Sequence, residues 1–126
     1  MVELAHVLPG EKMADLGTGD GRIAIAFREA RTHVDAFELD DTLLSLAQQN
    51  AKNAGVSINF IQKDFWFENL SQYTIICCYP MPTIMGRLEK KLHEELKPGS
   101  RVLLNYFPFK HWKLETTKDN IFLYIK

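Results

Sequence analysis

Short apolar runs alternate with amphipathic stretches along most of the chain, which predicts β-strands joined by α-helices. The apolar run of residues 13–16 precedes a glycine-rich stretch, and four further runs cover residues 33–39, 57–62, 73–79 and 101–107. The run Tyr73–Tyr79 is apolar throughout, which is typical of a parallel strand buried on both faces. The first five strands are expected to be parallel strands of one sheet.

Three longer helices are predicted between these strands by apolar positions at helical spacing. Their apolar stripes are Ile23, Ala26, Phe27 and Ala30; Leu43, Leu44, Ala47, Ala51 and Ala54; and Met85, Leu88, Leu92 and Leu96. Asp40 or Asp41 can cap the second helix and Gly55 can end it, while Thr83 can cap the third. In the third helix the pairs Lys90–Glu94 and Lys91–Glu95 are expected to face solvent. Residues 2–8 can form one helical turn or a loop before Pro9-Gly10.

The C-terminal end of the chain changes pattern. Residues 113–117 and 121–125 flank Lys118-Asp119-Asn120 and predict an antiparallel hairpin. The fold class is thus α/β, a doubly wound and mostly parallel seven-stranded sheet with few helices and a C-terminal antiparallel β-hairpin. With 126 residues, a single domain over residues 1–126 is expected.

Composition and charge narrow the function classes. The net charge is −1 with no basic stripe, so no nucleic-acid partner is expected. No apolar run approaches the length of a membrane span and no signal-peptide pattern is present, which favours a cytoplasmic location. The adjacent Cys77 and Cys78 lie in an apolar run and indicate buried strand residues. The four histidines are widely separated, so no metal site is predicted.

The glycine-rich stretch Asp15-Leu16-Gly17-Thr18-Gly19-Asp20-Gly21-Arg22 is the main candidate for ligand binding. Glycines permit positive φ and close backbone approach, and a helix start behind them offers free N–H groups. A dinucleotide fingerprint requires Gly or Ala where this chain has Arg22, which disfavours a nicotinamide cofactor.

Two acidic residues at later strand ends extend this candidate site. Glu38 ends the second predicted strand, where a carboxylate can accept hydrogen bonds from both ribose hydroxyls. Asp64-Phe65 follows the third strand and suits an adenine, because the carboxylate accepts from the amino group and the ring packs on the base. A helix cap followed by core aromatics explains Asp64-Phe65 equally well when the pair is considered alone.

These motifs together resemble the seven-strand S-adenosylmethionine-dependent methyltransferases over essentially the whole chain. Within them, the chain is similar to the small protein-lysine methyltransferases of archaea and mitochondria. The narrower likeness rests on the Gly-Asp-Gly-Arg loop, on residues 88–92 and 94–99 with Arg101-Val102, and on Phe107-Pro108-Phe109-Lys110-His111-Trp112.

The resemblance implies S-adenosylmethionine as cofactor and a role for each matching residue. The cofactor-binding set is Asp15, Gly17, Thr18, Gly19, Asp20, Gly21, Glu38, Leu39, Asp64, Phe65 and Tyr79. Asp15 and Asp20 are expected to hold the ammonium, Glu38 the ribose, and Asp64 with Phe65 the adenine. Tyr79 is expected beside the methyl group and, with Trp112, along the substrate channel, where Phe107 and Phe109 can also contribute.

The expected reaction is in-line methyl transfer to a nucleophile, with a protein lysine amine as the favoured acceptor and no dedicated general base. One alternative is methylation of a small molecule or a base amine. Base-amine enzymes often carry Asp or Asn before Pro-Pro-Tyr or Pro-Pro-Phe, whereas this chain has Cys78-Tyr79-Pro80-Met81-Pro82. Another alternative is a cofactor-binding module without catalysis, because only about a dozen residues precede the first strand.

Overall fold

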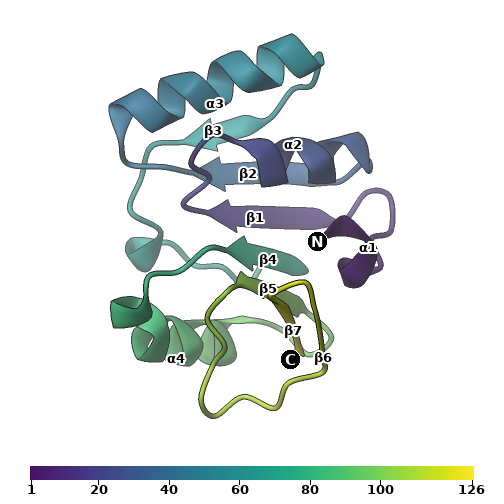
Figure 1. The fold of residues 1–126 in the computed structure, drawn as a ribbon, viewed down its shortest axis with the longest axis vertical. Coiled ribbons are helices and arrows are strands. Elements are labelled where there is room, and N and C mark those ends of the chain that lie inside the picture. Colours follow the sequence, from purple (N-terminus) through teal and green to yellow (C-terminus); the bar gives the residue numbers. More distant parts are fainter.

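One seven-stranded sheet runs through the protein, as described by a computed structural model that covers residues 1–126 (Figure 1). The spatial order of the strands is β3-β2-β1-β4-β5-β7-β6. The parallel strands are β1 (Lys12–Leu16), β2 (His33–Phe37), β3 (Asn59–Ile61), β4 (Ile75–Cys78) and β5 (Arg101–Asn105). β6 (Thr116–Lys118) and β7 (Ile121–Ile125) form an antiparallel hairpin that joins β5 through β7. The predicted sheet is confirmed.

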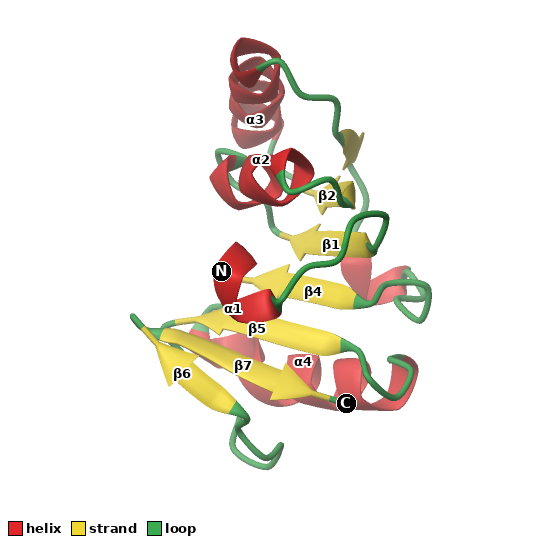
Figure 2. Ribbon diagram, turned by 90° about the vertical axis from the view of Figure 1, so that its right-hand side faces the viewer, coloured by secondary structure: helices red, strands yellow, loops and turns green.

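Helices cover both faces of the sheet, which confirms the doubly wound fold class. α1 (Val2–Ala5), α2 (Arg22–Glu29) and α3 (Asp41–Ala54) lie on one side, as Figure 2 shows. α4 (Met85–Glu95) lies on the other side. The short 3₁₀ turn η1 (Phe65–Phe67) packs against the α4-side core, and a second one, η2 (Pro82–Ile84), directly precedes α4. Crossover connections of a parallel sheet are right-handed, so reversing the winding direction after β3 sends α4 to the opposite face.

The period-two alternation of strand side chains divides the core into two clusters. Met13, Ile75 and Leu103 point toward α1 and α2, where they pack around Phe27. The intervening residues of the same strands point toward α4, whose Leu88 and Leu92 complete the second cluster with the adjoining Leu96. Both cysteines are buried and unbridged within β4, as the sequence predicted, and burial raises the pKa of each thiol.

Several element boundaries differ from the sequence-based expectation. β6 begins at Thr116 rather than at residue 113 and includes Lys118, which pairs with Ile121. The intervening turn is therefore only Asp119-Asn120, both with positive φ, which is the two-residue hairpin geometry that these residue types tolerate. The fifth strand ends at Asn105 instead of continuing to residue 107, because the backbone turns sharply at Tyr106.

The expected capping of the third helix by Thr83 was wrong. Thr83 lies inside η2, and α4 begins at Met85 after Ile84 without a side-chain cap. Pro82 starts this 3₁₀ turn and displaces the helix start. By contrast, Asp40 caps α3 through a 2.8 Å bond from the Leu43 N–H.

The Lys91–Glu95 pair was also expected in solvent and is instead partly buried. The Lys91 ammonium contacts Glu95 at 2.7 Å and donates to the carbonyl oxygens of Trp66 and Glu68. Lys91 therefore ties η1 to α4. This contact was not evident from sequence because it joins segments far apart in the chain.

α3 buries less of its apolar stripe than the sequence predicted. Ala47 and Ala51 are buried, whereas Leu43 is 39% exposed. Residues 2–5 do form a helical turn, and its Ala5 is fully buried against the sheet. Arg101 of β5 holds this turn by donating to the carbonyl oxygens of Ala5 and His6.

Leu103→Ala tests the importance of the central strands. Leu103 is fully buried, between β4 and β7, so the cavity should lower the free energy of unfolding by about 2–5 kcal/mol. Urea unfolding followed by circular dichroism measures this change. Leu114→Ala is the control, since Leu114 is 38% exposed, and should change stability by less than about 0.5 kcal/mol. Equal effects of the two substitutions would contradict the assignment of Leu103 to the core.

Candidate active site

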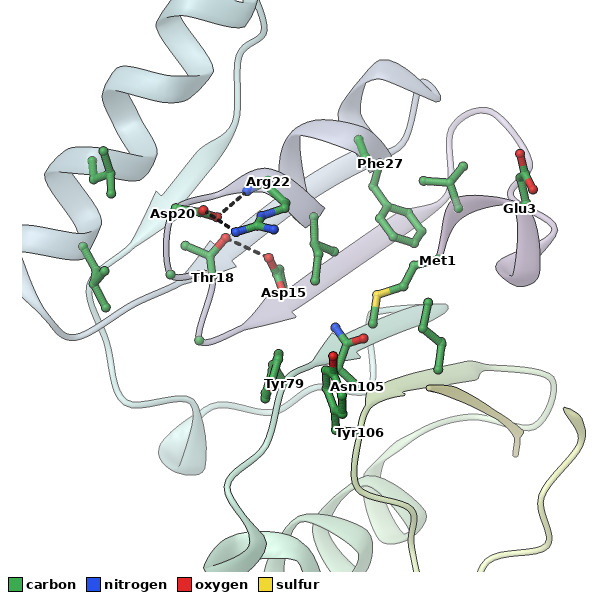
Figure 3. Close-up of a pocket in the computed structure, with 18 residues that line it drawn as sticks. Met1, Glu3, Asp15, Thr18, Asp20, Arg22, Phe27, Tyr79, Asn105 and Tyr106 are labelled. Carbon is green, nitrogen blue, oxygen red and sulfur yellow. Dashed lines mark hydrogen bonds and ion pairs between the residues drawn. The ribbon is translucent and has the colours of Figure 1, made fainter. Parts of the chain in front are cut away.

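A cleft of about 1100 Å³ opens at the carboxyl ends of β1, β4 and β5 (Figure 3). β1 and β4 are adjacent, but the chain leaves them in opposite directions, to α2 on one face and α4 on the other. Open α/β sheets bind ligands at such a reversal point because the two departing loops separate there. The cleft is lined by Met1, Val2, Glu3, Asp15, Gly17, Thr18, Gly19, Asp20, Arg22, Ile23, Ala26, Phe27, Leu43, Leu46, Tyr79, Asn105, Tyr106 and Ile121.

The strand register explains why residues distant in sequence meet in this cleft. Asp15 pairs with Cys77, and Cys77 pairs with Leu103, across three neighbouring strands. Two residues further along each strand, on the same face, the chain reaches Gly17, Tyr79 and Asn105. These three positions therefore form one row across the sheet edge.

The glycine-rich loop has the backbone conformation that its sequence predicted. Gly17, Gly19 and Gly21 have φ values of 74°, 58° and 84°. Gly21 is also confined by packing, because a Cβ there would lie 3.1 Å from the Ala47 Cβ of α3. The loop is joined to β2 by the Thr18 N–H, which donates to the Phe37 carbonyl oxygen at 2.8 Å.

Asp15 is a buried carboxyl group at the base of this loop. Its side chain accepts a 2.7 Å bond from the Thr18 hydroxyl, and only 2% of the residue is exposed. Burial raises the pKa of Asp15 to about 6; the Thr18 bond opposes this shift, and the nearby Glu38 charge adds to it. A cation placed in the cleft would relieve this cost of ionisation.

Glu38 lies just beyond β2 and contacts the loop directly. Its carboxylate accepts from the Gly19 N–H at 2.9 Å and from the Asp40 N–H at 3.1 Å. Asp20 pairs with Arg22 at 3.0 Å on the surface of the loop, and this pairing lowers the pKa of Asp20. The loop is thus held between two carboxylates, the buried Asp15 at its base and Glu38 at its rim.

Leu39, Asp64 and Phe65 lie along the same sheet edge but do not line the cleft. Leu39 is 58% exposed. Asp64 caps η1 by accepting from the Trp66 N–H at 3.0 Å, and Phe65 packs against Trp66 and the α4-side core. The cap interpretation of this motif is therefore present in the structure. The contact of Asp64-Phe65 with an adenine stays a prediction.

The structure does not bring Trp112 to the cleft. Its ring stacks on Phe109, contacts Tyr124 and His93, and donates from Nε1 to the Ile125 carbonyl oxygen. Phe107, Phe109 and His111 of the aromatic loop, residues 107–112, do not line the cleft either. The buried Glu89 of α4 accepts backbone N–H bonds from residues 110–112, which draws this loop toward α4.

Asn105 and Tyr106 are cleft residues that the sequence analysis missed. The sequence predicted a strand continuing to residue 107, which placed Asn105 within it. A polar residue that ends the apolar run Val102-Leu103-Leu104, on the Asp15 face of the sheet, was the available signal. Ile23 of α2 and Leu43 of α3 were assigned to the apolar stripes of their helices, and Leu46 was assigned no role; all three form an apolar wall of the cleft.

The family model of the ANTKMT methyltransferase domain matches residues 15–116. These residues include the glycine-rich loop, the switch point where the chain leaves β1 and β4 toward opposite faces, and the row of Gly17, Tyr79 and Asn105. The chain belongs to this family. This ANTKMT-domain protein is 36% identical over 116 residues to the adenine nucleotide translocase lysine N-methyltransferase of Mus musculus, covering 90% of this chain and 50% of that relative. The matched part thus spans about half the length of the mouse protein.

Two further similarities cover more of the compared chains. A protein-lysine N-methyltransferase of Saccharolobus islandicus is 30% identical over 116 residues, covering 89% of this chain and 72% of the relative. The solved structure of an RNA methyltransferase from Salinibacter ruber in complex with S-adenosyl-L-homocysteine is 31% identical, with a TM-score of 0.91. That comparison covers 98% of this chain and 86% of the other. The fold shared with the Salinibacter structure therefore extends beyond residue 116, where the family match ends, into the terminal hairpin.

The ANTKMT-domain protein was also searched for metal-binding clusters and for membrane-spanning helices. No group of three or more His, Cys, Asp and Glu side chains is arranged to hold a metal ion. None of the helices is long and apolar enough to cross a membrane.

Asp15→Asn should change how stability depends on pH in the ligand-free protein. The folded pKa of about 6 exceeds the ordinary value of 3.8, so the folded state binds the extra proton and wild-type stability falls as pH rises between these values. The asparagine variant lacks this loss and should be more stable than wild type by up to about 3 kcal/mol at pH 7.5, with little difference at pH 4. Urea unfolding across this range measures the difference.

Asp20→Asn is the control on the same loop. The pKa of Asp20 is lowered, so its carboxylate contributes stability above the ordinary pKa that is lost as pH falls. The difference between variant and wild type should have the opposite sign and be small. Parallel pH profiles for wild type and Asp15→Asn would contradict the burial argument.

Proposed function

We propose that this protein is an S-adenosylmethionine-dependent methyltransferase that acts on a protein lysine amine. The observation that carries the proposal is the cleft at the switch point, where a positive-φ glycine loop meets a buried carboxyl group, in a chain of the ANTKMT methyltransferase family. The lysine acceptor is supported by the mouse and Saccharolobus relatives, which are both named lysine methyltransferases.

The residues present fit this cofactor. Asp15 is almost fully buried yet borders the cleft, and a cationic ammonium is the partner that would favour its charged form. Asp20 can assist at the loop, where Gly17, Thr18, Gly19 and Gly21 allow close approach. Glu38 would hold the ribose by exchanging its loop contacts, and Leu39, Asp64 and Phe65 would hold the adenine. The Salinibacter structure, solved in complex with S-adenosyl-L-homocysteine, supports this choice of cofactor.

The bound cofactor supplies an electrophilic methyl group on a sulfonium. The chain's own contribution is to align an amine with that group, and such positioning can be worth about 7–11 kcal/mol. A lysine ammonium has an ordinary pKa of about 10.4, so it must lose a proton before it reacts. The apolar walls from α2 and α3 disfavour the charged amine by desolvation. Water can accept the proton, and no dedicated base is needed.

RNA is the second candidate acceptor, because the Salinibacter structure is described as an RNA methyltransferase. The sequence argues against it: 15 basic and 16 acidic residues give a net charge of −1, and phosphate recognition needs a concentrated basic surface. The cleft rim carries Glu3 and Asp20 beside the paired Arg22. A protein acceptor is therefore favoured.

We also propose that residues 1–126 act as one domain, since a single sheet joins both halves of the chain. A cytoplasmic location stays a prediction from the sequence.

Cofactor binding should depend on the ionisation of Asp15. Below pH 6 its carboxyl is mostly protonated and cannot pair with an ammonium. The Kd for S-adenosylhomocysteine should therefore be about tenfold higher at pH 5 than at pH 7.5. Asp15→Asn should bind at least tenfold more weakly at pH 7.5 and lose the pH dependence. Isothermal titration calorimetry measures both. A wild-type Kd that is equal at the two pH values would contradict the assignment of Asp15 to the ammonium.

The acceptor class can be tested with methyl-labelled S-adenosylmethionine, offered with poly-L-lysine or with total RNA as methyl acceptor. Label on methylated lysine supports the proposal, and amino-acid analysis identifies the product. Label in RNA would replace the lysine acceptor with the second candidate. Cofactor binding without label in either probe would favour the binding-module alternative.

A further inference from the structure

We infer that Asn105, Tyr106 and Tyr79 form the subsite for the methyl acceptor, and that this subsite selects an unbranched primary alkyl amine such as a lysine side chain. The Asn105 carboxamide oxygen receives an N–H of the amine, and the two tyrosine rings flank its carbon stem. This inference deepens the proposed function and rests on it. These three residues place an uncharged hydrogen-bond acceptor and two aromatic ring faces together at one side of the cleft.

Tyr106 is held in a costly backbone conformation at the cleft mouth. Its φ is 68°, and the Phe107 N–H donates to the Asn105 carbonyl oxygen at 2.8 Å, which closes a three-residue turn centred on Tyr106. A γ-turn with positive φ is rare and strained, and an aromatic residue has no intrinsic preference for it. Strain of this kind persists where the surrounding structure enforces it, often at functional sites.

The C-terminal hairpin supplies that enforcement. The Tyr106 N–H donates to the carbonyl oxygen of Asn120 at 2.8 Å, and Asn120 lies in the two-residue turn between β6 and β7. Ile121, the next residue, borders the cleft and pairs with Asn105. The hairpin therefore fixes both ends of the Asn105–Tyr106 segment relative to β5.

The two tyrosines form an open pair of ring faces. Their ring centroids are 5.4 Å apart at an interplanar angle of 36°, and the residues are 57% and 54% exposed. Figure 3 shows both side chains beside Asn105, across the cleft from Asp15 and the loop. Exposed ring faces attract a cationic amine and then pack against its methylene stem, so they favour an alkylammonium over an anionic or branched acceptor.

Asn105 provides an unused polar group at the same place. Its side chain lines the cleft, it is only partly exposed, and its carboxamide has no hydrogen-bond partner within the protein. The register puts it level with Tyr79 and Gly17. A carboxamide oxygen accepts an N–H without removing the proton, so it can orient a neutral amine while leaving the nitrogen lone pair free.

The resulting transfer is balanced. The amine lone pair forms a bond to the methyl carbon while the sulfur–carbon bond breaks, and the electron pair of that bond remains on sulfur as a thioether. The methylated nitrogen is then an ammonium, which releases its proton to water. Asn105 and the rings neither gain nor lose a proton, which agrees with a subsite that positions the acceptor by polarity and shape.

Two analogues of S-adenosylhomocysteine test the subsite without requiring turnover. In both, nitrogen replaces the sulfur; one carries an aminoethyl group there and the other an isosteric propyl group. The wild-type protein should bind the aminoethyl compound about tenfold more tightly, the effect of one hydrogen bond to a charged group. Asn105→Ala and Tyr106→Ala should each reduce this preference, and Asn105→Ala should reduce it more because it removes the hydrogen-bond acceptor. Tyr106→Phe should retain it, because the ring face remains.

Control variants separate a local role from a change in the fold. Asn53→Ala on α3 and Phe67→Ala in η1 remove an exposed amide and an exposed ring away from the cleft, and should keep the preference. Tyr106→Gly removes the ring but suits the positive φ, so it replaces Tyr106→Ala if that variant does not fold. All variants should bind S-adenosylhomocysteine itself within about threefold of wild type.

Each outcome of these titrations is decisive. An unchanged preference in Asn105→Ala and in the ring-less variants would overturn the subsite, as would the absence of any preference in wild type. In both cases binding of S-adenosylhomocysteine would leave the proposed cofactor site standing. A wild-type protein that binds none of the three compounds would instead refute the proposed function.

Discussion

The arrangement of this protein depends on the pairing of β1 with β4 in parallel register. Asp15 pairs with Cys77, so the carboxyl ends of both strands reach the same sheet edge, while the chain departs from them to opposite faces. The cleft exists because two neighbouring strands send their loops apart. Asp15, Cys77 and Leu103 lie side by side in this register. Gly17, Tyr79 and Asn105 form one row because each lies two residues beyond one of these three.

Burial of charge at this edge has a cost that a ligand can offset. Asp15 is enclosed by the glycine loop and the sheet, and its hydrogen bond from Thr18 does not fully compensate for lost hydration. A site with an unneutralised carboxyl group is less stable when empty and binds a cation more favourably. Stability and function therefore oppose one another at this residue, as is common at binding sites.

The C-terminal hairpin connects the fold to acceptor selection. In the sequence it is an antiparallel edge, remote from the glycine loop. In the structure its turn supports the strained Tyr106, and its Ile121 borders the cleft. The aromatic loop of residues 107–112, the more obvious candidate by composition, is drawn away toward α4 by the carboxylate of Glu89. The Asn120 carbonyl oxygen holds Tyr106 at the cleft, whereas the Glu89 carboxylate holds the aromatic loop beside α4.

Local interactions determined the features that the sequence alone could predict, whereas long-range contacts decided the rest. Apolar periodicity determines the alternation of strands and helices, and the conformations of the loop glycines follow from residue type. The turn at Tyr106 instead requires the carbonyl oxygen of Asn120, and the raised pKa of Asp15 requires enclosure by distant segments. The acceptor side of the cleft is likewise built from β4, β5 and the hairpin. No regular spacing in the sequence links these residues, because the strand register brings them together from distant parts of the chain.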